Sequence, residues 1–192
     1  MKSIGKYLSE RFATLELIEC QFIDVYAYIF DFLFNLFVYH LSLVIIGILL
    51  HRFVLSLIYA VITCFLRSIS GGYHAKGRLS CYILSYSIFL VYLMVCKFTY
   101  TNYITLNIFA YFVNWILILG ISPVENPNKL LSSKVRIKLR NFLYIIFSLT
   151  SIFTISLLLL NYNVQVYSLN ISLTICTIGL YAGYFSNRIR LK

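Results

Sequence analysis

The chain alternates long apolar stretches with short polar segments. Residues 32–50 contain no Asp, Glu, Lys or Arg, and residues 141–187 contain none either. A helix needs about 20 largely apolar residues to cross the hydrocarbon core of a bilayer. The pattern therefore predicts helices that span a membrane.

The same criterion predicts about six spans. The first four are expected at residues 32–50, 53–66, 79–96 and about 103–121. The polar triplet Asn161-Tyr162-Asn163 divides the uncharged stretch that follows into a hairpin of two more spans. Residues 53–66 are short for a complete crossing. They form either a span whose flanking Arg52 and Arg67 snorkel to the interface or a re-entrant half-helix.

Residues 1–24 carry a different pattern, in which apolar residues recur at helical spacing among charged ones. The apolar positions are Ile4, Leu8, Phe12, Leu15 and Ile18. This spacing predicts an amphipathic helix that lies on the inner membrane surface, and an ordinary helix packed against the spans is the alternative. Residues 1–19 lack the apolar core of a cleavable signal peptide.

Composition supports the membrane assignment. Of the 192 residues, 61% are apolar and 11% are charged, whereas about 25% of the residues of a typical soluble domain are charged. A soluble fold of this length cannot hide so much apolar surface from water. The expected class is an all-α, polytopic membrane protein, with residues 1–192 as one membrane-embedded domain.

The net charge of +10 is unevenly distributed. Five Lys and Arg residues fall within 129–140, and three fall within the last five positions. These cations flank apolar segments, so they indicate cytoplasmic segments facing anionic lipid rather than a nucleic-acid site. With the basic loop 122–140 and the C-terminus in the cytosol, the loop after residue 67 and the N-terminus lie there too. Arg52, expected outside, opposes this orientation.

One polar insert, residues 67–81, combines residues suited to chemistry. A cysteine nucleophile needs a base or a positive field to form its thiolate. His74 is a suitable base at neutral pH. Cys81 is expected at the start of a helix, where the helix dipole favours a thiolate, and Lys76 and Arg78 add positive charge.

Geometry restricts how His74 and Cys81 work together. In one straight helix they would lie about 10 Å apart along the axis, whereas proton transfer needs about 3 Å. The segment must therefore bend, for which Gly77 is the candidate, or the pair must form across two subunits. Gly71 and Gly72 are candidates to end the preceding helix or to admit a substrate backbone.

A second polar segment, residues 122–129, contains both prolines of the chain. Glu125, Asn126 and Asn128 are candidates to orient His74, as a third member orients a catalytic histidine. A loop that only ends a helix is the alternative. The cations that follow are candidates to bind an acidic peptide: Lys129, Lys134, Arg136 and Lys138. The five cysteines show no metal-binding spacing, and no cofactor is expected.

These two segments resemble the signatures of a known family, the accessory gene regulator protein B family. The first signature is carried by residues in this order: Arg67, Gly71-Gly72, Tyr73, His74-Ala75 and Cys81. The second is carried by Pro-Val-Glu-Asn-Pro-Asn-Lys at 123–129, after which Leu130 stands where the family usually has proline. Chain length, span number and the basic loop also fit, so the resemblance covers nearly the whole chain.

The resemblance implies a membrane cysteine endopeptidase of a bacterial quorum-sensing system. Cys81 would be the nucleophile and His74 its general base. The substrate would be a precursor peptide of the accessory gene regulator D type, which loses its acidic C-terminal tail and is closed into a thiolactone or lactone ring. The family also suggests a homodimer in the cell membrane.

Two other functions stay open from the residues alone. One is a peptide or small-molecule transporter, which polar residues within spans, such as Asn35 and Asn114, would suit. Against it, the sequence shows no internal repeat and no acidic residue deep in a span. The other is an assembly partner in which Cys81 is structural or palmitoylated. The substitution Cys81→Ser distinguishes them, because it should abolish only a peptidase.

Overall fold

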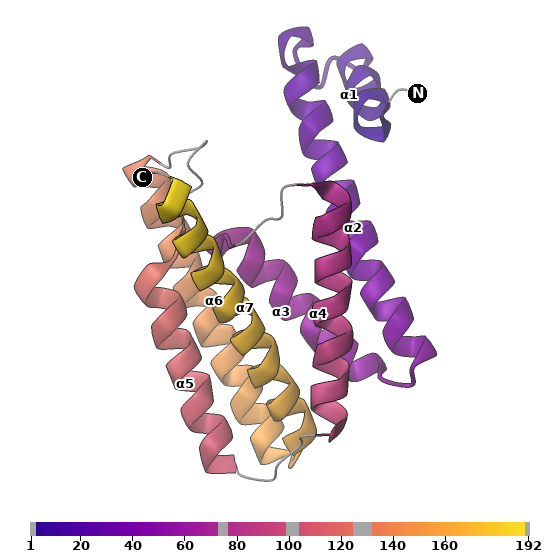
Figure 1. Cartoon of the computed structure of the whole chain (residues 1–192). Helices are drawn as coiled ribbons and strands as arrows, with labels where there is room; N and C mark the ends of the chain where they lie inside the picture. The colour runs from indigo at the N-terminus through magenta and orange to yellow at the C-terminus, as the bar shows by residue number, and fades with distance from the viewer. Residues whose placement is uncertain (1–2, 73–76, 99–103, 125–131, 191–192) are drawn as a thin grey trace. The chain divides into compact units, whose positions relative to one another are not determined.

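The computed structural model describes residues 3–72, 77–98, 104–124 and 132–190 (Figure 1). These residues form helices and connecting turns, with no strand among them, which confirms the all-α class. The elements are α1 (Ile4–Thr14), η1 (Cys20–Phe22), α2 (Ile23–Leu49), α3 (Phe53–Ser70), α4 (Arg78–Phe98), α5 (Ile104–Ile121), α6 (Ser133–Leu159) and α7 (Asn163–Arg190). The chain divides into two compact units, residues 1–45 and residues 46–192.

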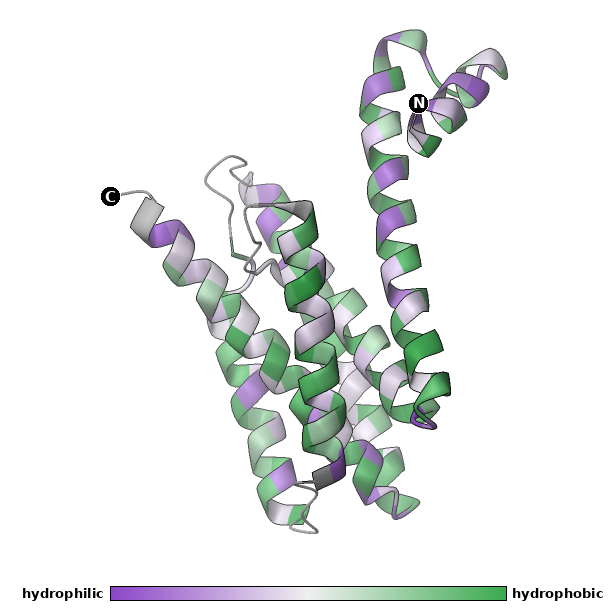
Figure 2. Ribbon diagram, turned by 45° about the vertical axis from the view of Figure 1, so that its right-hand side comes forward, coloured by the Kyte–Doolittle hydropathy of each residue, from purple (hydrophilic) through white to green (hydrophobic). Residues whose placement is uncertain are grey.

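Among the described residues, six helices are long and apolar enough to cross a membrane, as the sequence predicts. Figure 2 shows that hydrophobic residues cover most of the length of these helices. The short second segment is one continuous helix of 18 residues, because α3 continues through the polar turn that ends at Ser70. A helix of that length extends about 27 Å, close to the hydrocarbon thickness of about 30 Å, which favours a complete span over a half-helix.

In the first unit, α1 folds back onto α2. Ser3 caps α1 by accepting a hydrogen bond from the Lys6 N–H at 3.2 Å. The Gly5 N–H donates to Asp31 Oδ1 at 2.8 Å, and the Phe12 ring stacks on Phe30. These contacts attach the short helix along its length to the start of α2.

The prediction of one amphipathic helix over residues 1–24 is wrong in its second half. The helix ends at Thr14, and the chain then turns through Glu16, whose φ is 57°. A residue in this left-handed conformation cannot continue a right-handed helix. Cys20 to Phe22 form only a short 3-10 turn before α2 begins.

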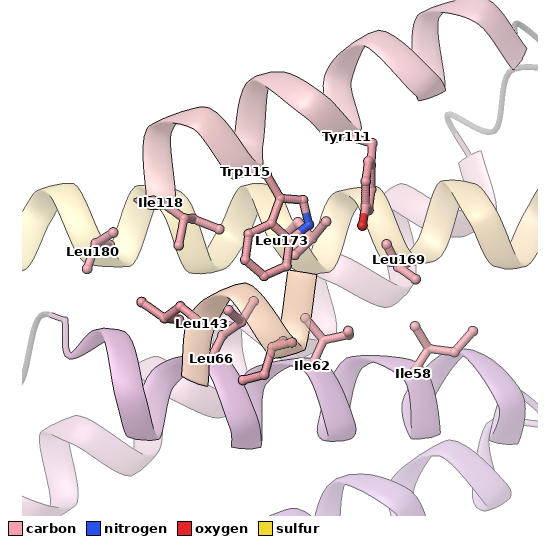
Figure 3. Close-up of a cluster of buried hydrophobic side chains, with 11 residues drawn as sticks. Ile58, Ile62, Leu66, Tyr111, Trp115, Ile118, Leu143, Leu169, Leu173 and Leu180 are labelled. Atoms are coloured by element: carbon pink, nitrogen blue, oxygen red, sulfur yellow. The ribbon is translucent and has the colours of Figure 1, made fainter. Parts of the chain in front are cut away.

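In the second unit, α7 is the central helix and contacts α3, α4, α5 and α6. The core cluster, drawn in Figure 3, joins four of these helices; it comprises Ile58, Ile62, Leu66, Tyr111, Trp115, Ile118, Leu143, Ile146, Leu169, Leu173 and Leu180. The turn between α6 and α7 passes through Asn161, with φ 59°, which confirms the predicted hairpin break.

Hydrogen bonds between side chains also join α5 to α7. Asn114 donates to Thr174 Oγ1 at 3.0 Å and accepts from Thr177 Oγ1 at 3.1 Å. The Asn170 side-chain amide donates to the Asn107 carbonyl oxygen at 3.0 Å. Hydrogen bonds of this kind hold membrane helices together, because lipid tails offer polar side chains no hydrogen-bond partner.

Candidate active site

Successive helices of the second unit run in opposite directions, so one end of this unit brings together the ends of α3, α5 and α7 and the starts of α4 and α6 (Figure 1). We call this the signature end, because residues 67–72, 77–81 and 122–124 lie there. Residues that are far apart in the sequence thus meet at one end of the bundle.

Gly71 ends α3, as predicted. Its φ of 78° and ψ of −158° belong to a region open almost only to glycine. A Cβ added at Gly71 would lie 2.9 Å from the Val124 carbonyl oxygen, so this position also allows a close backbone approach. The chain leaves the helix here because no other residue type fits both requirements.

The end of α3 is bonded to the start of the second polar segment. The Val124 N–H donates to the Ser70 carbonyl oxygen at 2.9 Å. Val124 immediately precedes Glu125, so the two signature segments are joined at this point. Sequence reasoning missed this contact, because it joins backbone atoms of Ser70 and Val124, which the side-chain pattern does not reveal.

Cys81 lies in the first turn of α4. Gly77 forms a bend just outside the helix, and its carbonyl oxygen accepts from the Cys81 N–H at 3.0 Å. Ser80 Oγ accepts from the Gly77 N–H at 3.3 Å and donates to the Gly77 carbonyl oxygen at 2.9 Å. Gly77 is thus a bend immediately before α4 begins at Arg78, at the position where the sequence places its candidate bend.

The thiol of Cys81 belongs to the inward face of α4. Cys81 is half-buried, and it is followed at helical spacing by the buried residues Ser85, Tyr92 and Cys96. Leu79, on another face of the same turn, is 74% exposed. A thiol on the inner face suits a nucleophile enclosed by protein better than a lipid-anchored cysteine facing the bilayer.

A cavity of about 300 Å³ opens one helical turn from Cys81, between α3, α4 and α7. Its lining comprises Tyr59, Thr63, Arg67, Ser70, Gly71, Gly72, Leu84, Ser85, Ile88, Ile175, Cys176, Ile178, Gly179 and Ala182. Three predicted site residues, Arg67, Gly71 and Gly72, are therefore part of one wall. In the sequence, Gly179 gives only a weak hint of the α7 wall, because Gly183 is another glycine in the same uncharged stretch.

The predicted basic loop is partly helical. Ser132 caps α6 by accepting from the Val135 N–H at 3.4 Å, so helix begins at Ser133. Lys134, Arg136 and Lys138 are consequently exposed residues of the first turns of α6 rather than loop residues. They still lie at the signature end.

Several predicted site residues lie outside the described residues. These are His74, Lys76, Glu125, Asn126, Asn128 and Lys129, together with the side chain of Arg78. The pairing of His74 with Cys81 and the orientation of His74 by a third residue remain predictions.

Comparison with known proteins gives one match. The family model described as AgrB, accessory gene regulator B, matches residues 1–184 of the chain. No curated protein and no solved structure matches it. The matched region contains both signature segments and most of α7.

Proposed function

This chain belongs to the accessory gene regulator B family, and on that premise we propose that it is a membrane cysteine endopeptidase that matures a signalling peptide. Family membership gives it a role in the agr quorum-sensing system. The six long apolar helices among its described residues make it a multi-pass membrane protein. We also propose the reaction, the residues that carry it out and the side of the membrane on which the active site lies.

The placement of Cys81 carries the proposal. The thiol lies in the first turn of a helix, on its inner face, one turn from an open cavity. The helix dipole stabilises negative charge at that position. The hydrogen bond from Val124 to Ser70 holds the start of the second signature beside the end of α3, which carries the start of the first signature. A lone structural cysteine would require none of these features.

In the proposed reaction, His74 accepts the proton of the Cys81 thiol, and the sulfur attacks the peptide carbonyl before the acidic tail of an accessory gene regulator D type precursor. The C–N bond breaks, and the tail leaves with the proton returned by His74. The precursor remains as an acyl-thioester on Cys81. A cysteine or serine of the precursor then attacks that carbonyl, closes the thiolactone or lactone ring and frees the thiol.

The positive charges at the signature end indicate the orientation of the protein in the membrane and the partners it binds. Lys134, Arg136 and Lys138 lie at the same end of the unit as Cys81. We infer that this end faces the cytosol, because cytoplasmic segments carry the excess of Lys and Arg. The same cations suit anionic lipid and the acidic tail of the substrate. A homodimer, which the family suggests, belongs to the proposal as well.

The transporter alternative loses its main support. Asn114 bonds two threonines of α7, and the Asn35 side chain donates to the Asp31 carbonyl oxygen at 2.7 Å. Both polar residues are thus used within the protein. We therefore do not propose transport.

The test is co-expression with the precursor encoded in the neighbouring reading frame, followed by mass spectrometry of the peptides. The wild-type protein should release the acidic tail, whereas Cys81→Ser and His74→Ala should not. The matched control is Cys96→Ser, on the same face of the same helix, which should retain processing. Tail release by Cys81→Ser at the wild-type rate would contradict the proposal.

A further inference from the structure

We propose that the cavity between α3, α4 and α7 is the specificity pocket for one large apolar side chain of the precursor, that of the residue whose carbonyl Cys81 attacks. This inference rests on the proposed function. It adds a recognition site to the chemistry and assigns it to residues of the first signature, such as Gly71 and Gly72, together with residues that neither signature includes, above all Gly179 on α7.

Position favours this role. Leu84 and Ser85 line the cavity one turn along α4 from Cys81, a rise of about 5 Å. A carbonyl held for attack lies about 3 Å from the sulfur. The side chain on the same residue extends a comparable distance from that carbonyl, so a side chain directed along the inner face of α4 enters the cavity.

The size and lining fit an apolar side chain. At about 300 Å³, the cavity is at the lower limit of ligand pockets, which hold about 300–1,000 Å³. Leu84, Ile88 and Ile178 supply apolar walls. A charged side chain of the acidic tail would find no cation there except Arg67, which already has an interaction within the protein.

The remaining polar lining explains why a peptide fits better than a lipid chain. Arg67 and Ser70 belong to the same wall as Gly71 and Gly72, at the end of α3. Backbone amides and carbonyls of a bound peptide can meet polar groups at that wall while the side chain fills the apolar part. Arg67 and Ser70 already have partners within the protein, whereas Gly71 and Gly72 carry no side chain and let a peptide backbone approach this wall closely.

Gly179 lines the cavity and has no side chain that would fill it. A Cβ added at Gly179 would meet no atom within 4 Å, and the residue lines the cavity. A larger side chain at this position therefore starts in open space beside the cavity, without displacing a neighbour at its first carbon. Replacing a helical glycine also stabilises a helix by up to about 1 kcal/mol, so such variants should fold.

The experiment uses Gly179→Leu in the full chain, with Gly120→Leu as its matched control. A Cβ at Gly120 also meets nothing within 4 Å, but Gly120 lies on α5, outside the cavity lining. Each protein is co-expressed with three precursors that differ only at the residue whose carbonyl is attacked, which carries Ala, Leu or Phe. Tail release is measured by mass spectrometry.

The wild-type protein and Gly120→Leu should process the Leu and Phe precursors faster than the Ala precursor by about 10-fold or more, since even one methylene in a hydrophobic pocket changes the rate by about 10- to 200-fold. Gly179→Leu should lose this preference and process the Ala precursor at least as well as the other two. Such a change of preference requires the side chain to occupy the space next to Gly179.

Two results would overturn the pocket while leaving the peptidase intact. The first is an unchanged preference in Gly179→Leu. The second is an equal loss with all three precursors, accompanied by loss of a co-purifying lipid in native mass spectrometry, which would assign the cavity to an acyl chain. Absence of tail release by the wild type with every precursor would instead overturn the proposed function and the pocket with it.

Discussion

The helices α3, α4 and α7 pack in two different ways along their length. Away from the signature end, aromatic rings fill the space: the Tyr59 and Tyr92 centroids are 4.6 Å apart, and those of Tyr59 and Phe89 are 5.2 Å apart. We call this the filled region. Toward the signature end, small residues such as Gly72, Gly179 and Ala182 line the cavity, and we call this the hollow region.

The difference in packing indicates that the two regions have different roles, one in stability and one in processing. Tyr92 is fully buried, and its hydroxyl donates to the Leu55 carbonyl oxygen at 2.8 Å, so the filled region joins α4 to α3. In the hollow region, within one or two turns of Cys81, small residues take the place of this aromatic packing. We therefore expect substitutions in the filled region to change stability and substitutions in the hollow region to change processing.

The largest stability effect is expected from Tyr92→Ala. Removing a fully buried aromatic ring leaves a cavity and costs about 3–5 kcal/mol. The midpoint of thermal unfolding in detergent should fall by many degrees, while processing per folded molecule stays near that of the wild type. Tyr92→Phe, which keeps the ring and loses only the hydroxyl contacts, should cost about 1 kcal/mol. Equal losses from both variants would contradict the filling role of the ring.

Gly71→Ala, unlike Tyr92→Ala, should lower processing by the folded protein. Its backbone conformation costs a residue with a Cβ about 1–3 kcal/mol, and the Cβ would lie 2.9 Å from the Val124 carbonyl oxygen. The strain should displace the second signature, so tail release should fall about tenfold or more, since each 1.4 kcal/mol changes a rate tenfold. Gly120→Ala is the matched control and should process normally. Normal processing by Gly71→Ala would show that the Ser70–Val124 contact does not support the reaction.

Much of the fold was predictable from the sequence. Uninterrupted apolar stretches predict the spans because their length must match the bilayer, and the glycines at 71, 72 and 77 predict the breaks around the site. The extent of the N-terminal helix was not predictable from spacing, since Leu15 and Ile18 continue the apolar stripe beyond the turn at Glu16. Periodicity reports which face is apolar, not where the backbone leaves the helix.

The hollow region could not be predicted at all. Its walls come from three helices, and its α7 wall lies about 100 residues beyond Cys81 in a stretch without charge. Ser70 and Val124 meet through backbone atoms, which leave no mark on side-chain pattern. Contacts of this kind depend on how helices pack, and apolar sequence alone specifies that weakly.

A third substitution tests whether stability effects extend beyond the filled region. Asn114→Ala removes the hydrogen bonds to Thr174 and Thr177, which join α5 to α7. Each bond between membrane helices contributes about 0.6 kcal/mol, so the unfolding midpoint should fall slightly and processing per folded molecule should not change. Processing lost without any loss of stability would instead revive a direct role for this residue.

The smallest effect on stability is expected from Ser80→Ala, next to Cys81 at the signature end. The Ser80 hydroxyl bonds both backbone groups of Gly77 and so fixes the first turn of α4. Losing it should cost about 0.5–1 kcal/mol, as for other helix caps, yet a turn that carries the nucleophile should become less well positioned, and tail release should fall severalfold. Ser87→Ala, an exposed serine on the same helix, is the control. If both variants process at the wild-type rate, the order of the first turn does not limit the reaction, and the hollow region matters only through the space it leaves open.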